Sequence, residues 1–166
     1  PICLGIWKST NGGTTWTRLL STSNFAYVQD LQLDNAGNLY AALRNRTVTQ
    51  ALGIQKSIDG GLSWTQVLGS PVFGPSSRGA DLELAANGDL YASIGFFAQG
   101  RIYKSSAALH GINVGNAGAW EDITPDPSSN VVPLATGSDA YDRIELAVAP
   151  SNPDLLYAIF EGNGTQ

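Results

Sequence analysis

The sequence has little cysteine, little charge and no long apolar run, and each shortage excludes a class of protein. Cys3 is the one cysteine in 166 residues, which excludes an intrachain disulfide and a cysteine-based metal site. No apolar run approaches the roughly 20 residues that a membrane-spanning helix needs. Nine Lys and Arg residues against 14 Asp and Glu residues give a net charge of −5, without the basic stripe that nucleic acid requires. We therefore expect no nucleic-acid partner and no membrane span.

Methionine is absent, and the first residue is Pro1. From this we expect a chain that was processed or cut from a longer protein, so a missing signal peptide carries no weight. Low charge and little cysteine, with many small polar residues, are typical of bacterial secreted proteins and predict an extracellular or periplasmic location. Hydrophobic residues make up 43% of the chain, and the 19 glycines and 8 prolines accompany little helical periodicity. The chain is thus expected to fold into many short strands joined by turns.

The three lysines of the chain mark a sequence repeat. Lys8, Lys56 and Lys104 are spaced 48 residues apart, and a serine follows each of them. Residues 9–16 (STNGGTTW) and 57–64 (SIDGGLSW) are two copies of one phrase. A fixed period of this length indicates stacked supersecondary units.

Between the two copies the sequence predicts four strands joined as an antiparallel meander. The first strand alternates apolar and polar residues, and Asn and Gly residues supply the tight turn that follows it. The next unit repeats this plan. A partial unit stands at each end of the chain. The predicted strands are residues 27–33, 39–43, 53–57 and 63–68, then 80–84, 90–94, 100–104 and 120–123, then 143–148 and 155–160.

Four-stranded antiparallel units with this period predict an all-β fold, a β-propeller of repeated blades. We divide the chain into a half blade (1–20), a blade (25–68), a second blade (78–124) and a second half blade (140–166). Because propellers have about four to eight blades, we expect a fragment of a larger ring whose other blades belong to a longer parent chain. The alternative is that the two halves close into one composite blade, which gives a ring of three.

The repeated phrase resembles the Asp-box, the bacterial neuraminidase repeat, in which a Ser or Thr, an Asp or Asn, a Gly and a Trp are regularly spaced. Two copies match, and a third is interrupted by an insertion at residues 107–117. The residues that carry the resemblance are Ser9, Asn11, Gly13 and Trp16, then Ser57, Asp59, Gly61 and Trp64, then Ser105, Gly118 and Trp120.

The residue types of this box predict a structural turn. A short Asp or Asn side chain accepts backbone N–H bonds from residues further along the turn, the glycines allow a left-handed φ, and the Trp offers an apolar face to the neighbouring blade. A cation at Asp59 is the alternative, but Ile58, Gly60 and Leu62 supply none of the oxygen ligands that calcium requires. We therefore predict no metal and no cofactor.

In the families that share the box, it lies on the rim opposite the functional site. The resemblance thus moves the search to the loops at 21–26, 44–52, 69–79, 95–99, 124–140 and 161–166. An arginine cluster with carboxylates suits an acidic sugar, because guanidinium binds a carboxylate through two hydrogen bonds. The alternative is a set of solvated loop charges in ordinary surface pairs. The predicted ligand-binding residues are Arg44, Arg78, Arg101, Arg143, Phe96, Phe97 and Tyr141.

Propellers similar to this one include sialidases, xyloglucan-cleaving glycoside hydrolases and sortilin-type receptors. In the xyloglucan-cleaving type a catalytic Asp follows a second strand, and Glu161 stands at that position here, with Asp142 as its candidate partner. Our main hypothesis is a non-catalytic binding or scaffolding segment for a glycan or protein ligand within a larger secreted protein. The alternative is part of a glycoside hydrolase of xyloglucanase or sialidase type, with Glu161 and Asp142 as catalytic residues.

Overall fold

The computed structural model describes residues 5–44, 47, 49–72, 74–97, 100–125 and 141–161. Within these residues, every sheet is formed by strands that follow one another in the sequence and pair antiparallel. One four-stranded sheet contains β3 (Val28–Leu33), β4 (Leu39–Leu43), β5 (Gly53–Ser57) and β6 (Thr65–Leu68), in that order. The other contains β7 (Gly79–Leu84), β8 (Leu90–Ile94), β9 (Arg101–Ser105) and β10 (Glu121–Asp122). Two further pairs are β1 (Trp7–Lys8) with β2 (Thr17–Arg18), and β11 (Ile144–Val148) with β12 (Leu156–Phe160).

The sheets repeat one another in detail. β3 and β7 both carry an irregularity in register near their start, before Asp30 and before Asp81 respectively. The turns that follow contain Gly37 and Gly88, both with a φ near +85° (83° and 88°), a conformation that glycine adopts without steric cost. The predicted four-stranded meander is therefore confirmed in both sheets.

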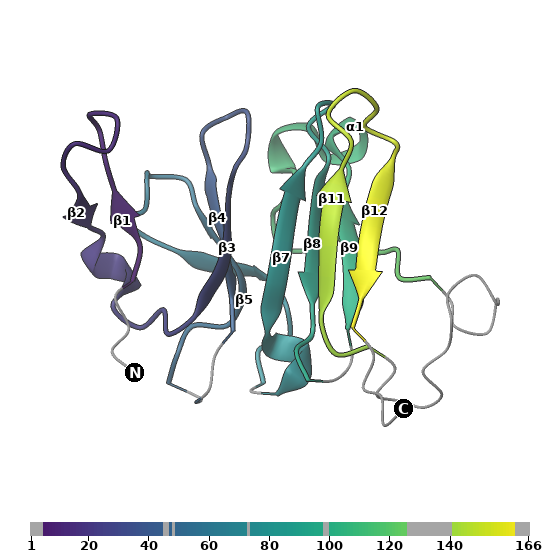
Figure 1. Cartoon of the computed structure of the whole chain (residues 1–166), viewed down its shortest axis with the longest axis horizontal. Coiled ribbons are helices and arrows are strands. Elements are labelled where there is room, and N and C mark those ends of the chain that lie inside the picture. The colour runs from purple at the N-terminus through teal and green to yellow at the C-terminus, as the bar shows by residue number, and fades with distance from the viewer. Residues whose placement is uncertain are drawn as a thin grey trace.

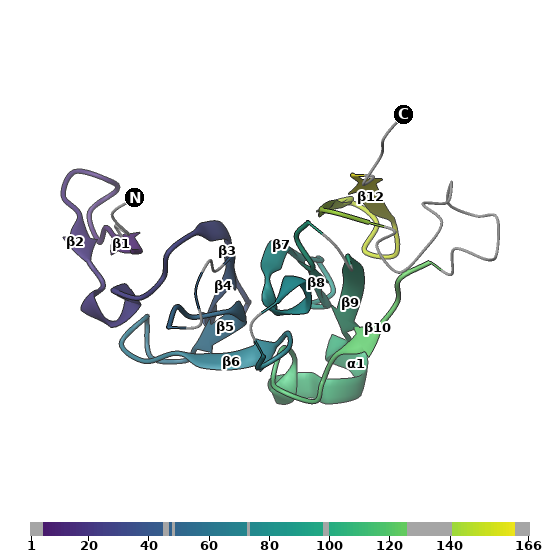
Figure 2. The same cartoon turned by 90° about the horizontal axis from the view of Figure 1, so that it is seen from below.

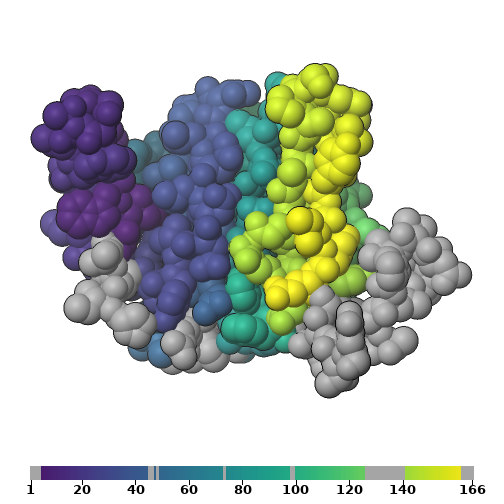
Figure 3. All heavy atoms as spheres, in the orientation of Figure 1, coloured from purple at the N-terminus to yellow at the C-terminus, as the bar shows by residue number. Residues whose placement is uncertain are grey.

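The first strands of the sheets lie beside one another. β3 contacts β7, and β7 contacts β11, so the sheets form an arc that Figure 2 shows from below. This is how blades surround the axis of a β-propeller. The pairs β1–β2 and β11–β12 stand at opposite ends of this arc and belong to separate sheets (Figures 1 and 3). The alternative of a closed three-blade ring is therefore wrong for this structure, because the two half sheets do not pair.

Apolar side chains fill the space between neighbouring sheets. Tyr40 and Leu82 belong to the cluster between the two four-stranded sheets, and Tyr91 and Leu146 belong to the cluster between β7–β10 and β11–β12. A third cluster, around Phe25 and Leu43, joins the first four-stranded sheet to the β1–β2 end. Burial between sheets rather than within one sheet is what stabilises this repeat.

Short helical segments occur outside the strands. They are η1 (Leu20–Thr22), η2 (Pro75–Ser77), α1 (Ala107–His110) and η3 (Gly111–Asn113). Within the described ranges, no helix is both long enough and apolar enough to cross a bilayer.

Candidate functional site

The turn between β5 and β6 closes through side-chain hydrogen bonds. Asp59 Oδ1 accepts the backbone N–H groups of Leu62 and Ser63, each at 2.9 Å. Ser57 Oγ accepts the N–H of Gly61 at 2.8 Å and donates to Asp59 Oδ1 at 2.7 Å. The bonds from Ser63, Ser57 and Leu62 hold the pKa of Asp59 well below its ordinary value. The polar groups of Ser57 and Asp59 therefore form hydrogen bonds within their own turn.

The β1–β2 turn uses the same bonds with Asn in place of Asp. Asn11 Oδ1 accepts the N–H of Thr15 at 2.9 Å, and Ser9 Oγ accepts that of Gly13 at 2.8 Å. Trp16 donates from Nε1 to the carbonyl of Gly13 at 3.0 Å and is exposed.

The three box tryptophans differ in their surroundings. Trp64 meets Phe25 edge-on, with ring centroids 5.2 Å apart, and Trp120 packs against the cluster between the two four-stranded sheets. Trp16 is exposed, so the contact with a neighbouring blade predicted for the box tryptophan is absent at this position. Trp64 and Trp120 therefore pack against neighbouring parts of the fold, and Trp16 does not.

The insertion in the third copy forms a strap between the two four-stranded sheets, which we define as residues 107–117. Ser105 Oγ accepts the N–H of Gly115 at 2.8 Å, so Gly115 takes the place in the turn that the sequence assigned to Gly118. The carbonyl of Val114 then accepts the hydroxyl of Tyr40 at 3.2 Å and the ammonium of Lys56 at 3.0 Å. The strap thereby ties one sheet to the next.

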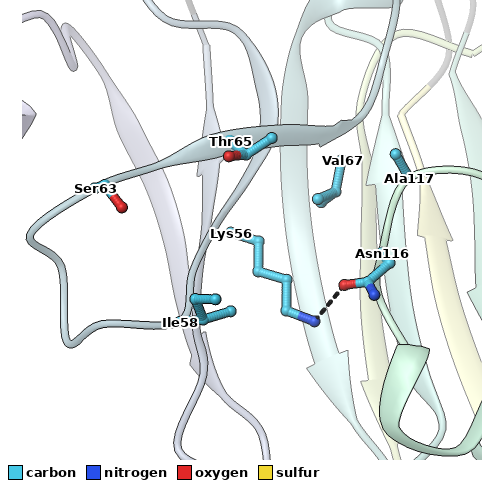
Figure 4. Close-up of a pocket in the computed structure, with 7 residues that line it drawn as sticks. All are labelled: Lys56, Ile58, Ser63, Thr65, Val67, Asn116 and Ala117. Carbon is cyan, nitrogen blue, oxygen red and sulfur yellow. Dashed lines mark hydrogen bonds between the residues drawn. The ribbon is translucent and has the colours of Figure 1, made fainter.

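A pocket of about 310 Å³ lies beside this strap (Figure 4). Lys56 points across it and donates to Asn116 Oδ1 at 2.8 Å. Burial lowers the pKa of Lys56, and the nearby Asp34 carboxylate partly opposes this effect. The pocket is lined by Lys56, Ile58, Ser63, Thr65, Val67, Asn116 and Ala117.

The repeated lysine has a structural partner in each complete sheet. Lys56 stands over the ring of Tyr40, 5.1 Å from its centroid, and Lys104 stands over that of Tyr91 at 5.5 Å. Lys104 also pairs with Asp89 at 2.8 Å, and this bond raises the pKa of Lys104. The lysine period therefore reflects contacts that hold each blade together, which the sequence alone did not reveal.

The opposite rim gathers arginines around two phenylalanines, a group we call the arginine–phenylalanine cluster (Arg44, Arg78, Arg143, Phe96 and Phe97). The guanidinium of Arg44 lies 4.6 Å from the centroid of Phe96 and 5.1 Å from that of Phe97. Arg78 approaches Phe97 at 5.5 Å, and Arg143 approaches Phe96 at 5.6 Å. All of these distances are within the roughly 6 Å range of cation–π attraction.

Strand ends position the three arginines. Arg44 directly follows β4, and its N–H bonds the carbonyl of Tyr27 at 2.9 Å. Arg78 directly precedes β7, and Arg143 directly precedes β11. The carbonyl of Arg78 accepts the N–H of Gly95 at 2.7 Å, and the side chain of Arg78 donates to the carbonyl of Phe96 at 2.9 Å. The starts of two first strands and the end of one second strand thus lie at one level and bring the three side chains together.

Phe97 is the exposed member of the cluster. Phe97 is 54% exposed, whereas Phe96 is buried and meets it edge-on, with ring centroids 5.1 Å apart. Phe97 has a φ of +73°, which no other non-glycine residue among those described adopts. A bulky residue in this region is strained by about 1–3 kcal/mol, and such strain is concentrated at functional positions.

Two of the guanidinium groups of the cluster, those of Arg44 and Arg78, repel one another. Burial lowers the pKa of Arg78, and repulsion from Arg44 lowers it further. Arg143 pairs with Glu145, while the Nε of Arg44 is buried with no hydrogen-bond partner among the described residues. An anionic or polar ligand would relieve this repulsion and supply an acceptor.

The structure does not bring every predicted ligand-binding residue into the cluster. Arg101 lies toward the outer edge of its sheet, where its Nε is 3.7 Å from Asp122. Tyr141 was predicted as an aromatic platform, but its ring is buried against Phe160, with centroids 4.7 Å apart, which leaves no face for a ligand. Both residues contribute to packing and pairing within or between sheets.

Asp142 and Glu161 adjoin the cluster beside Arg143. The N–H of Asp142 bonds the carbonyl of Glu161 at 2.8 Å, and the N–H of Glu161 bonds that of Arg143 at 2.9 Å. Asp142 Oδ1 is buried without a hydrogen-bond partner in the described part of the chain. The predicted loop residues at 45–46, 48, 73, 98–99, 126–140 and 162–166, and Cys3, lie outside the described residues. Among those described, no group of three or more metal-ligating side chains is present.

No family model matches the sequence, and a search of the curated proteins finds no match. The fold and the order of sheets define part of a β-propeller. Among solved structures, the crystal structure of the GH74 xyloglucanase from Xanthomonas campestris is similar, with a TM-score of 0.55 and 19% sequence identity. The match covers 95% of this chain and 24% of that enzyme, so this chain spans about a quarter of the enzyme's length.

Proposed function

We propose that this chain is a glycan-binding part of a glycoside-hydrolase-like β-propeller, and that the arginine–phenylalanine cluster contacts the sugar. The observation that carries the proposal is the exposed, strained ring of Phe97, with the guanidinium of Arg44 5.1 Å from its centroid. The likeness in fold to part of a xyloglucanase supports a polysaccharide as the ligand class. A secreted location belongs to the same proposal, since a protein that binds polysaccharides finds them outside the cell.

The chemistry of the cluster fits a sugar. One face of a pyranose ring carries C–H groups that pack on an aromatic face, and its hydroxyls point outward from the rim of the ring. The exposed part of the Phe97 ring offers apolar surface, and Arg44, whose guanidinium stands over that ring, offers N–H donors. The same donors would bind a carboxylate through two hydrogen bonds, so an acidic sugar is the stronger ligand in this proposal.

A catalytic role is the second candidate, and it rests on Asp142 and Glu161. Their backbones are joined at 2.8 Å, so their two carboxyl groups start from adjoining positions at the edge of the cluster. Glycosidases work with two carboxyl groups about 5–10 Å apart. In this candidate Asp142, whose Oδ1 is buried, acts as the acid and Glu161 as the base or nucleophile.

Titration calorimetry with xyloglucan oligosaccharides and with an acidic oligosaccharide such as sialyllactose tests the binding proposal. We expect Phe97→Ala and Arg44→Gln to weaken binding about fivefold or more, as the loss of roughly 1 kcal/mol implies. Arg101→Gln, which removes an arginine outside the cluster, is the matched control and should bind as the wild type does. Equal binding by all three variants, or no binding by the wild type, would contradict the proposal.

Turnover of the same oligosaccharides separates the two candidates. If the chain is catalytic, Glu161→Gln and Asp142→Asn should abolish product formation while binding persists. Binding without turnover in the wild type leaves the non-catalytic role and excludes the catalytic one for these substrates.

A further inference from the structure

The pocket beside the strap lies between the two four-stranded sheets (Figure 4). Its volume of about 310 Å³ is at the lower end of the range of small-molecule sites, roughly 300–1,000 Å³. Its residues come from β5, β6 and the turn between them on one side, and from the strap on the other. The middle of the chain therefore builds the walls, and neither the β1–β2 pair nor the β11–β12 pair contributes a described residue to them.

The lysine of this pocket lacks the carboxylate partner that its repeat-equivalent has. Lys56 and Lys104 occupy the same position in β5 and β9, each paired in register with the second-strand tyrosine. Lys104 forms an ion pair with Asp89, which directly precedes β8, whereas Asn38 directly precedes β4. Among the described residues, Lys56 forms no ion pair. The first sheet thus buries this cation without the anion that the second sheet provides.

Neutral oxygens surround the ammonium of Lys56 in place of that carboxylate. Lys56 is 6% exposed and donates to the carbonyl of Val114 at 3.0 Å and to Asn116 Oδ1 at 2.8 Å. These two bonds leave one of its three N–H groups without an acceptor among the described residues. The carboxylate of Asp34 is nearby, but it accepts hydrogen bonds from its own turn and strand. A buried ammonium with an unused N–H favours an anionic acceptor.

The walls around Lys56 supply a hydroxyl and an apolar surface. Thr65 is the register partner of Lys56 on β6, so the two side chains lie on one face of the sheet. Val67 lies two residues further along β6 and therefore on the same face. Ile58 and Ala117 complete the apolar part of the lining. The pocket thus combines a cation and a hydroxyl with an apolar wall.

We propose that this pocket binds a small organic carboxylate. The carboxylate accepts hydrogen bonds from the ammonium of Lys56 and the hydroxyl of Thr65, and the apolar body of the ligand packs on Ile58 and Val67. An inorganic anion would satisfy the cation but not the apolar wall, and a neutral ligand would leave the cation unpaired. The pocket lies apart from the arginine–phenylalanine cluster, so this inference does not depend on the proposed glycan site.

Lysine-selective NMR of the full chain tests the proposal, because the three lysines give three side-chain signals. The signal of Lys56 is identified by its absence from Lys56→Arg. Butyrate should shift this signal and saturate at roughly millimolar concentration, as expected for a ligand of few atoms. The signals of Lys8 and Lys104 should stay in place.

Two further compounds separate the charge of the ligand from its shape. Butyramide has the shape of butyrate without the charge, and sulfate has charge without an apolar body. Each should bind at least tenfold more weakly than butyrate. A Lys56 signal that butyrate does not shift, or that butyramide or sulfate shifts at the same concentration, would overturn the proposal.

Two exposed residues of the β5–β6 turn provide matched variants. Ile58 lines the pocket and is 77% exposed, whereas Leu62 is 76% exposed and is not part of the lining. Ile58→Asp places a negative charge at the pocket and should weaken butyrate binding at least fivefold. Leu62→Asp adds the same charge to the same turn and should bind as the wild type does, at an ionic strength of about 0.15 M that screens charges beyond about 8 Å.

Both substituted side chains are exposed, so circular dichroism should show an unchanged fold for each variant. Equal weakening by Ile58→Asp and Leu62→Asp would contradict the proposal, because a general effect of charge would then explain the loss. Unchanged binding by Ile58→Asp would place the carboxylate elsewhere and would contradict it too.

Discussion

The carboxylate of Asp81 accepts the backbone N–H of Leu146 at 2.6 Å across the boundary between β7 and β11. Asp30 accepts the N–H of Leu82 in the same way at the preceding boundary. The repeat therefore carries its own polar connection between sheets in addition to the apolar contacts. Its cost is the placement of an acid in a poorly solvated position.

The burial of the Asp81 carboxyl makes the free energy of unfolding depend on pH at values above the ordinary pKa of a carboxyl group. Burial raises the pKa of Asp81, Glu145 and Asp30 raise it further, and the N–H bond from Leu146 opposes the rise. A raised pKa means that the folded chain binds more protons than the unfolded chain between the ordinary value, about 3.9, and the raised one. The free energy of unfolding should therefore increase as the pH falls from neutral into this window.

Urea titrations of the wild type and Asp81→Asn between pH 7 and pH 4 measure this effect. The Asn side chain keeps an acceptor for Leu146 without the charge, so the variant should show a weaker increase on acidification. Asp154→Asn, at an exposed turn, is the control and should follow the wild type. Identical pH profiles for wild type and Asp81→Asn would contradict the assignment.

The strands of this fold are readable from the sequence because each is set by local pattern. Residues 39–43 and 90–94 were predicted with the bounds observed for β4 and β8, since an Asn/Gly turn precedes each and most of the strand residues are apolar. The strap was not predictable in this way. Its contacts to Tyr40 and Lys56 join residues far apart in the sequence, and no periodicity in residues 107–117 predicts these contacts.

The candidate site was only partly predictable for a related reason. Strand order places Arg44, Arg78 and Arg101 at the same end of the sheets. It does not say which lie near the axis and which lie near the outer edge. Arg101 begins a third strand and turns toward Asp122, whereas Arg78 precedes a first strand and reaches Phe97. That difference arises from packing between sheets, which a single sequence does not record.

Gly115 provides a test of the strap. A Cβ added there would stand 2.5 Å from the hydroxyl of Tyr40, and the φ of +69° already disfavours any side chain. We expect Gly115→Ala to lower the free energy of unfolding by about 2–4 kcal/mol, combining backbone strain with overpacking. Gly118→Ala is the matched control: its φ is +82°, but nothing lies within 4 Å of the added atom, so it should cost only about 1 kcal/mol. Equal losses in chemical denaturation would show that the strap is not packed on Tyr40.

Lys104 and Asp89 form an ion pair whose acid is almost fully enclosed, with 5% of its side chain exposed. Burial raises the pKa of Asp89, but the bonds from Lys104 and from the N–H of Ala107 outweigh it and hold the pKa below its ordinary value. Lys104→Met leaves that acid without its cation and should cost about 1–3 kcal/mol, since the lysine is partly solvated.

The pH dependence of this pair has the opposite sign to that of Asp81. A depressed pKa contributes stability above the ordinary carboxyl range, and this stability is lost as the pH falls through the folded value. The difference between wild type and Lys104→Met should therefore shrink below about pH 4. The double variant Lys104→Met/Asp89→Asn should recover most of the loss at pH 7; if it is no more stable than Lys104→Met, the pairing is not the cause.

Asp59 tests whether the box acts through its hydrogen bonds or through its charge. In the β1–β2 turn Asn11 accepts the N–H of Thr15 at 2.9 Å without any charge, so Asp59→Asn should keep the acceptor for Leu62 and Ser63. Asp59→Ala removes the acceptor and leaves both N–H groups to water. Calorimetric melting should thus show a small decrease in Tm for Asp59→Asn and a clearly larger one for Asp59→Ala. Equal decreases would mean that the charge, and not the acceptor, closes the turn, because both variants lose the charge and only one loses the acceptor.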